Sequence, residues 1–195
     1  MKARFAEFIQ AGEPAAAFAA LAKFRVLCAL RHGPFGIHRI NALIEDALFP
    51  NRRGEFYDHR LILVTKNDYE INLFNGDIGV VLPDPKRNGD SAVFFESRSR
   101  SLPCHLLPPH ETAFAMTVHK AQGSGFNHVL VLLPDRESPV LTRELIYTAI
   151  TRTETGVELW CEEHTFKKGV LTETRRSMGL KERLDSAQPR GYSKL

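Results

Sequence analysis

Polar and turn-forming stretches divide the chain into short apolar runs. Such runs lie at residues 24–30, 61–68, 112–118, 128–134 and 156–162. Most of them are continuously apolar rather than alternating, a pattern typical of strands that are buried on both faces of a sheet. This pattern predicts an α/β fold built on a parallel, doubly wound sheet.

Helical stretches separate several of these runs. Residues 2–23 predict two short helices and residues 37–48 predict a third, because helix formers and apolar residues recur on one helical face. A fourth helix is expected over residues 141–152, where Thr142 is in position to cap the amino end. Strands joined through helices in this way favour a sheet with helices on both faces.

Residues 68–110 have a different sequence pattern. Asn-Gly-Asp occurs twice within them, each time followed by a run rich in β-prone residues. Asn-Gly beside such runs is the strongest short-range sign of a β-hairpin. We therefore expect a small antiparallel β-subdomain, inserted into an α/β domain that comprises residues 1–67 and 111–185.

Composition and charge change this picture only slightly. The chain has 195 residues, 43% of them hydrophobic, which suits one globular domain with a small insertion. The formal net charge of +3 is compatible with a polyanionic partner. No long apolar stretch is present, so we expect no signal peptide, no membrane span and a cytoplasmic location. Residues 186–195 are expected to form a disordered tail.

Cysteine and glycine patterns argue against two common kinds of site. No GxxxxGK[ST] sequence occurs, so the chain contains no Walker A phosphate loop. The cysteines form no CxxC pair or Cys/His cluster, and we expect reduced thiols and no metal site. These cysteines are Cys28, Cys104 and Cys161.

Four acidic residues deserve comparison with known metal sites. Asp135 ends an apolar run as a Walker B acid does, but Pro134 intervenes and no second acid follows. Asp84, Asp90 and Glu96 lie in the expected β-insert and leave a metal nuclease open as an alternative function. Hairpin turns use Asp for their own hydrogen bonds, which accounts for these acids without a metal.

The stretch AMTVHKAQGSGF, residues 115–126, places polar side chains where an apolar run ends. A loop at the carboxyl end of a parallel strand lies where such sheets bind ligands. Hydroxyl, imidazole, ammonium and backbone N–H groups are the usual contacts for phosphate, although a His-Lys pair is also common on plain solvated surface. The candidate contacts are Thr117, His119, Lys120, Gln122, Gly123, Ser124 and Gly125.

Two arginines are further candidates for phosphate contacts. Arg31 directly follows the apolar run 24–30, and Arg152 ends the expected helix 141–152. Placed together at the carboxyl edge of one sheet, two arginines could clamp a phosphoryl group, as an arginine finger does. The alternative for Arg152 is a cation that stabilises the carboxyl end of its helix.

Three segments in this order resemble motifs IV, V and VI of superfamily 1 helicases. They are the strand followed by Arg-His-Gly at 31–33, TVHKAQGSGF at 117–126 and RELIYTAITRT at 143–153. The likeness is closest to the RecD type, the alpha subunit of exodeoxyribonuclease V. It extends to LFNGDIGVVLP at 73–83 and TETRRSMGLKERL at 172–184, and so covers most of the chain.

The resemblance implies a fold and a set of roles. The α/β part would be a RecA-like motor domain, 2A, and residues 68–110 an SH3-like 2B subdomain. Arg31 and Arg152 would reach the γ-phosphate of ATP across a cleft between two RecA-like domains, as catalytic and nucleotide-binding residues. Gln122 and Gly123 would lie where motif V links DNA to nucleotide. The single-stranded DNA contacts would be Thr117, His119, Lys120 and Ser124.

The sequence also departs from the family pattern. Motif V usually carries acids where this chain has Gly125 and Asn127, and the motif VI arginine is followed here by a segment that contains Glu154. A carboxylate at position 125 would be expected to hold the ribose. Motifs I, Ia, II and III are absent, so the ATP and Mg²⁺ site would be completed by an N-terminal RecA-like domain, 1A.

Taken together, the residues and the resemblance predict the C-terminal half of an ATP-dependent, 5′-to-3′ DNA helicase of recombinational repair, inactive as an isolated chain. The implied partners are single-stranded DNA, domain 1A and, in some family members, RecB- and RecC-like subunits. The main alternative is a DNA-binding or partner-docking module that keeps the helicase fold without motor function, and Gly125 is the feature that favours it.

Overall fold

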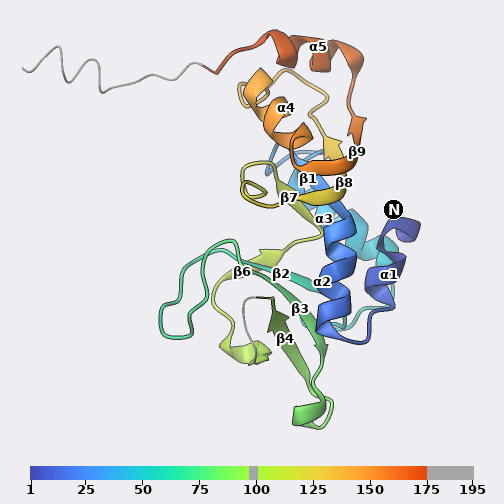
Figure 1. The fold of residues 1–195 in the computed structure, drawn as a ribbon, viewed down its shortest axis with the longest axis vertical. Helices are drawn as coiled ribbons and strands as arrows, with labels where there is room; N and C mark the ends of the chain where they lie inside the picture. The colour runs from blue at the N-terminus through green and yellow to red at the C-terminus, as the bar shows by residue number, and fades with distance from the viewer. Residues whose placement is uncertain (97–100, 175–195) are drawn as a thin grey trace, which may run out of the picture.

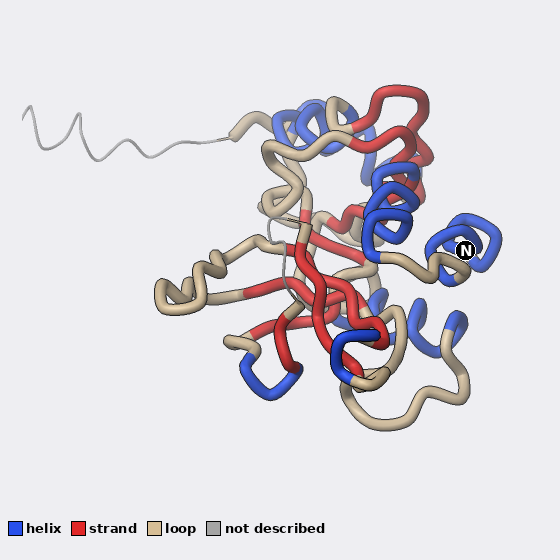
Figure 2. The backbone as a smooth tube through the Cα atoms, turned by 60° about the horizontal axis from the view of Figure 1, so that its bottom comes forward, coloured by secondary structure: helices blue, strands red, loops and turns tan. Residues whose placement is uncertain are grey.

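Two β-sheets stacked along the long axis organise the molecule. The computed structural model describes residues 1–96 and 101–174. A parallel sheet with its helices forms the upper part of Figure 1 and an antiparallel sheet the lower part. Figure 2 shows the same two groups of strands from below. The predicted fold class, an α/β domain with an antiparallel β-insert, is confirmed.

The parallel sheet has the strand order β7-β1-β8-β9. All three neighbouring pairs run parallel, so each strand presents its carboxyl end at the same edge. Every residue of β1 is buried, as the continuous apolar run predicted. The strands are β1 (Phe24–Cys28), β7 (Ala115–Thr117), β8 (Phe126–Leu132) and β9 (Thr153–Trp160).

Helices cover this sheet. Helix α2 contacts β1 and β8, α3 contacts β7, and α4 contacts β8 and β9. Thr142 caps α4 as predicted, since its hydroxyl accepts a hydrogen bond from the Leu145 N–H at 3.3 Å. Helix α5 was not predicted from the sequence. The helices are the 3₁₀ turn η1 (Lys2–Phe5), α1 (Ala6–Ile9), α2 (Pro14–Lys23), α3 (Ile37–Leu48), α4 (Arg143–Ile150) and α5 (Glu163–Leu171).

The antiparallel sheet has the strand order β5-β4-β3-β2-β6. Short 3₁₀ turns, η2 (Pro85–Arg87) and η3 (Cys104–Leu106), flank β4 and β5. The hairpin predicted from the second Asn-Gly is present between β3 and β4, where Asn88 and Gly89 both have positive φ angles. The strands are β2 (Leu61–Val64), β3 (Ile78–Pro83), β4 (Ser91–Phe95), β5 (Leu102–Pro103) and β6 (His110–Thr112).

One strand lies in a different sheet from the one predicted. The run at 61–68 was assigned to the α/β domain, but β2 pairs antiparallel with β3 and β6. Its side chains alternate between two cores: Leu61 and Leu63 face the main core, while Ile62 and Val64 face a smaller cluster. The run is continuously apolar because both faces of the antiparallel sheet are covered there. The antiparallel sheet therefore extends beyond the predicted insert, residues 68–110, and includes β2.

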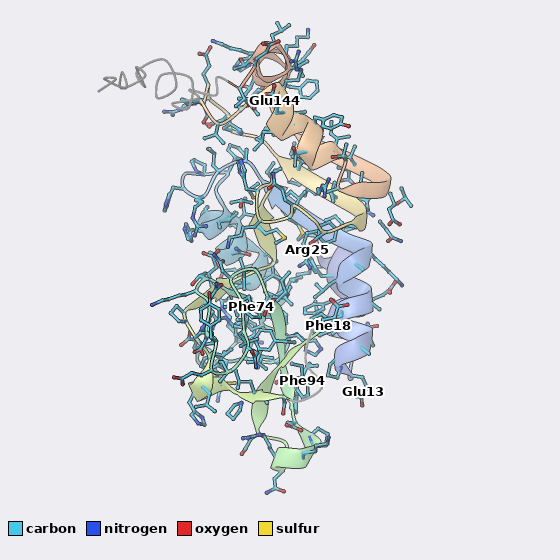
Figure 3. The ribbon with its side chains drawn as sticks, turned by 60° about the vertical axis from the view of Figure 1, so that its left-hand side comes forward. Glu13, Phe18, Arg25, Phe74, Phe94 and Glu144 are labelled. Carbon is cyan, nitrogen blue, oxygen red and sulfur yellow. The ribbon has the colours of Figure 1, made fainter. Side chains whose placement is uncertain are left out.

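The main hydrophobic core spans both sheets. Phe114, which is fully buried between β6 and β7, packs edge-on against Phe5 at a ring distance of 5.7 Å. Phe18 of α2 and Phe94 of β4 pack against the same core where the helix passes the antiparallel sheet (Figure 3). The insert is thus fixed to the α/β part by shared apolar packing.

A buried amide fixes the start of β7. Asn41 of α3 donates hydrogen bonds to the carbonyls of Thr112 and Ala115 and accepts one from the Ala115 N–H. The side chain is only 5% exposed, so its polar atoms depend on these partners. This arrangement holds the strand that leads into the polar loop 117–125.

Replacing Gly79 with alanine is expected to destabilise the protein by about 1–3 kcal/mol. A Cβ atom on Gly79 would lie 2.6 Å from Val93 Cγ1 and 2.8 Å from Phe95 Cε1, across the strand pair β3 and β4. Urea denaturation measures the loss. Gly12→Ala is the matched control, because no atom lies within 4 Å of its added Cβ. Equal free energies of unfolding for the two variants would contradict the packing described here.

Candidate functional site

The polar loop begins at the carboxyl edge of the parallel sheet. The Val118 N–H donates to the carbonyl of Cys28, so the ends of β7 and β1 lie together there. Thr117 is only 7% exposed, and its hydroxyl accepts a hydrogen bond from the Lys120 N–H at 3.3 Å. This contact turns the chain sharply and leaves the His119 side chain exposed beside it.

Tight turns carry the loop back toward β8. The Gln122 N–H donates to the His119 carbonyl, and the Ser124 N–H donates to the Ala121 carbonyl. Gly123 has a φ of +87°, a conformation that favours glycine. Within the described residues, the side chains of His119 and Gln122 make no hydrogen bond. Both are therefore available to a ligand.

A hollow of about 560 Å³, here called the basic hollow, brings four of the predicted site residues together. Its walls include Leu30, Arg31, Thr117, His119, Lys120 and Val140. Hydroxyl, imidazole, ammonium and guanidinium groups thus converge at one sheet edge, which is the chemistry of a phosphate contact.

Arg31 is held in the basic hollow by Glu111 of β6. The guanidinium donates to Glu111 Oε2 at 2.8 Å, while Glu111 Oε1 is buried without a hydrogen-bond partner in the described residues. Lys120 in turn contacts the Asn75 side chain in the loop between β2 and β3. Two cations of the hollow are therefore contacted by the antiparallel sheet and by the loop between β2 and β3.

Arg152 lies at the opposite edge of the sheet, so the predicted joint clamp with Arg31 is wrong. The Arg152 carbonyl accepts a hydrogen bond from the N–H of Phe126, the first residue of β8. Strand β9 begins at Thr153, directly after Arg152. Arg31 instead follows the carboxyl end of β1. The five residues of β1 alone span about 16 Å. In a parallel sheet, a residue that precedes a strand lies at the amino edge, and a residue that follows a strand lies at the carboxyl edge.

Ser124 also lies at this amino edge, although the sequence analysis placed it with Thr117. The Arg152 Nη1 donates to the Ser124 carbonyl at 3.4 Å, and its Nε donates to the Thr148 carbonyl at 3.2 Å. The loop 117–125 therefore crosses the sheet from its carboxyl edge to its amino edge. It connects the basic hollow to Arg152.

Two of the departures from the motif pattern, Gly125 and Glu154, are neighbours. A Cβ atom on Gly125 would lie 3.9 Å from Glu154 Oε1, so a carboxylate is present beside the position that lacks one. Glu154 follows Arg152 on β9. The space next to Gly125 is otherwise open, and a larger side chain there would meet Glu154.

Two of the acidic residues considered for metal chemistry have other partners. Asp84 accepts a hydrogen bond from the Lys86 N–H at 3.0 Å and caps the 3₁₀ turn η2. Asp135 lies 4.0 Å from the guanidinium of Arg136. The described residues contain no group of three or more His, Cys, Asp or Glu side chains placed to hold a metal ion. Within the same residues, no helix is long and apolar enough to cross a membrane.

Two acidic residues near the loop were missed by the sequence analysis. Glu111 contacts Arg31, and Glu144 at the start of α4 lies near His119, on the wall of a pocket that both residues share. Glu111 is far from Arg31 in the sequence, and Glu144 is far from His119. No spacing or motif in the sequence connects the two residues of either pair. The predicted tail at 186–195 lies outside the described residues.

Comparison with known proteins identifies sequence relatives. The UvrD-like helicase C-terminal domain matches residues 112–159. The RecBCD enzyme subunit RecD of Mycolicibacterium smegmatis is 40% identical over 184 residues, which are 90% of this chain and 32% of that protein. The ATP-dependent RecD2 DNA helicase of Deinococcus radiodurans is 35% identical over 135 residues, 66% of this chain and 18% of that protein. The chain thus spans about a third or less of the length of these relatives.

Solved structures share the fold. The Pif1 helicase from Bacteroides in complex with ADP-AlF3 and single-stranded DNA superposes with a TM-score of 0.55 at 16% identity, covering 90% of this chain and 48% of that chain. A structure of two coordinating Pif1 helicases at forked double-stranded DNA gives a TM-score of 0.54 at 15% identity, covering 84% and 44%. At such identities the likeness concerns the fold alone, and it confirms the predicted RecA-like architecture.

Proposed function

The chain belongs to the RecD type of superfamily 1 helicases and corresponds to the C-terminal part of such a protein, and on this premise we propose that it is the second motor domain of a DNA translocase. In this proposal the α/β part is domain 2A and the antiparallel sheet is its 2B subdomain. The domain contributes a grip on single-stranded DNA and an arginine finger, and the motor moves 5′ to 3′.

The basic hollow is the observation that supports this proposal most strongly. Arg31, Thr117, His119 and Lys120 line one hollow at the carboxyl edge of the sheet, where open α/β sheets bind ligands. We assign these residues to backbone phosphates of a single DNA strand. Arg31 is included because it lies with these residues and apart from Arg152.

The loop 117–125, here called the crossing loop, gives a physical link between DNA and nucleotide. Its first half lines the basic hollow, and its second half, with Gly123 and Ser124, runs beside Arg152 at the amino edge. We assign Arg152 to the γ-phosphate of ATP held by domain 1A, and Gln122 and Gly123 to the connection between the sites. A displacement of the loop at one edge of the sheet would then also move the part of the loop at the other edge.

ATP and Mg²⁺ enter this proposal through the first motor domain. No GxxxxGK[ST] sequence occurs in the chain, so the phosphate loop and the Mg²⁺ ligands would come from domain 1A. Arg152 and the neighbouring loop would add positive charge and N–H donors to the far side of the nucleotide. Binding of ATP would close the cleft between the domains and move their two DNA grips relative to each other.

The setting of the proposed motor is recombinational DNA repair in the cytoplasm. One of the named relatives is a RecBCD enzyme subunit and another is an ATP-dependent RecD2 DNA helicase. RecB- and RecC-like subunits are therefore proposed as partners if the chain belongs to a RecBCD-type complex. Domain 1A is a proposed partner in either case. A docking module without motor function is the second candidate, and the absence of a carboxylate at Gly125 favours it.

Lys120→Ala is expected to weaken binding of the chain to single-stranded DNA and to lower the salt dependence. Loss of one phosphate contact should reduce the slope of log K against log salt by about 0.7–1. Fluorescence anisotropy with a labelled oligonucleotide, at several salt concentrations, measures both effects. Lys167→Ala on α5 removes the same charge from an exposed i, i+4 pair and serves as the control. Identical slopes for the two variants would overturn the assignment of the basic hollow to DNA.

A further inference from the structure

A smaller pocket adjoins the basic hollow. It has a volume of about 330 Å³ and shares His119 and Val140 with the hollow. We call it the Glu144 pocket. Glu144 lies at the end of the molecule away from the antiparallel sheet (Figure 3). The other walls of the pocket come from the crossing loop and from α4, and they include Val118, Gln122, Glu144, Leu145 and Thr148.

The walls combine apolar and polar surface. Val118 and Leu145 are buried side chains and Val140 is 42% exposed, so part of the lining is apolar. His119 and Gln122 bring ring nitrogens and an amide that have no hydrogen-bond partner within the described residues. An apolar surface beside unpaired hydrogen-bonding groups suits a flat ring with a polar edge.

Glu144 brings a fixed negative charge to this pocket. Its Oε2 accepts hydrogen bonds from the hydroxyl of Thr174 at 2.7 Å and from the Thr174 N–H at 3.0 Å. These bonds, with the Thr174 hydroxyl first, lower the pKa of Glu144 to about 2, so the carboxylate is charged at neutral pH. Neither of these Thr174 bonds goes to Oε1, and the Arg143 guanidinium lies 3.8 Å from that oxygen. One carboxylate oxygen can therefore accept from a ligand.

We propose that the Glu144 pocket holds one nucleobase of the bound strand and prefers a base that carries an exocyclic amino group over thymine. This inference rests on the proposed function, since it places the phosphate of the same nucleotide in the basic hollow. The two spaces meet at His119, so a single nucleotide can reach from one into the other.

Charge separates the two spaces. Arg31 and Lys120 favour phosphate in the basic hollow, whereas the carboxylate of Glu144 repels it from the pocket. A carboxylate accepts hydrogen bonds only, and the amino group of cytosine donates them. Thymine has the acceptor O4 at the position of that amino group, and this oxygen would face the carboxylate oxygen of Glu144 without a hydrogen bond. The pocket should therefore bind oligo(dC) in preference to oligo(dT).

The test compares binding of the chain to oligo(dC) and oligo(dT) of about 12 nucleotides, at low salt and neutral pH. We expect a preference for oligo(dC) of about fivefold, which is roughly 1 kcal/mol. Glu144→Gln should bring the two affinities within about twofold, because the amide can also donate. Glu173→Gln is the control, since this acid pairs with Arg143 and does not line the pocket.

Each outcome has a separate meaning. Equal binding of both oligonucleotides by the unmodified chain overturns the base pocket and leaves the proposed strand grip intact. A preference that Glu144→Gln leaves unchanged overturns the role of Glu144. Binding of neither oligonucleotide overturns the proposed function and this inference with it. Thermal unfolding confirms that each variant is folded, and the unmodified chain decides the first outcome without any variant.

Discussion

Arg152→Ala is expected to lower ATP hydrolysis about 10³-fold or more once this chain is joined to a first motor domain. An arginine finger acts on charge that develops on the transferred phosphoryl group, so its loss falls on kcat. The present contacts of Arg152, with the carbonyls of Ser124 and Thr148, hold the side chain at the amino edge. Single-strand-stimulated ATP hydrolysis by the joined protein measures the effect.

Arg143→Ala is the matched control for this prediction. Arg143 begins the same helix that Arg152 follows, and it is exposed and paired with Glu173. Its loss should leave turnover within a small factor of the parent. Arg152→Lys should remain strongly impaired, because an ammonium group does not reproduce the guanidinium fork. Turnover within about tenfold of the parent after Arg152→Ala would contradict the finger assignment.

Phe114→Ala is expected to destabilise the chain by about 3–5 kcal/mol, the largest effect on stability that we predict. The ring is fully buried and contacts Phe5, Phe8 and Phe49, with ring centroids at 5.7, 6.1 and 5.8 Å. It lies between β6 and β7, where the two sheets share one core. Its removal leaves a cavity that rings from three different segments cannot fill together.

Urea denaturation of the isolated chain measures this loss as a shift of the midpoint. Tyr69→Ala removes an aromatic ring that is 74% exposed and should change the free energy of unfolding only slightly. If Phe114→Ala cost no more than Tyr69→Ala, the two sheets would not depend on a shared core. A change in the slope of the transition would instead indicate that the insert unfolds separately.

The fold could be predicted from the sequence wherever one pattern had one physical cause. Helix α3 spans Ile37–Leu48, the range predicted, because its apolar periodicity and its start after Gly36 agree. The run at 61–68 shows the limit of this reasoning. A continuously apolar strand indicates burial on both faces, and parallel pairing is only one of the ways to achieve it. Strand β2 is buried on both faces because alternate side chains enter the main core and a smaller cluster of the antiparallel sheet.

The candidate site was predicted in its residues but only partly in its geometry. Thr117, His119 and Lys120 meet as expected because they follow one strand end directly. The expected joint clamp of Arg31 and Arg152 assumed that both lie at the carboxyl edge, although a residue that precedes β9 must lie at the amino edge. Glu111 and Glu144 could not be found at all, because only the tertiary fold brings them to the loop.

The most direct test of the account is ATP hydrolysis, stimulated by single-stranded DNA, for this chain alone and for the chain joined to a first motor domain of the RecD type. We predict no turnover above background for the chain alone, and turnover in the joined protein that depends on Arg152. Turnover by the isolated chain would contradict the half-motor assignment. A joined protein that binds DNA through Lys120 but hydrolyses no ATP would instead favour the docking module.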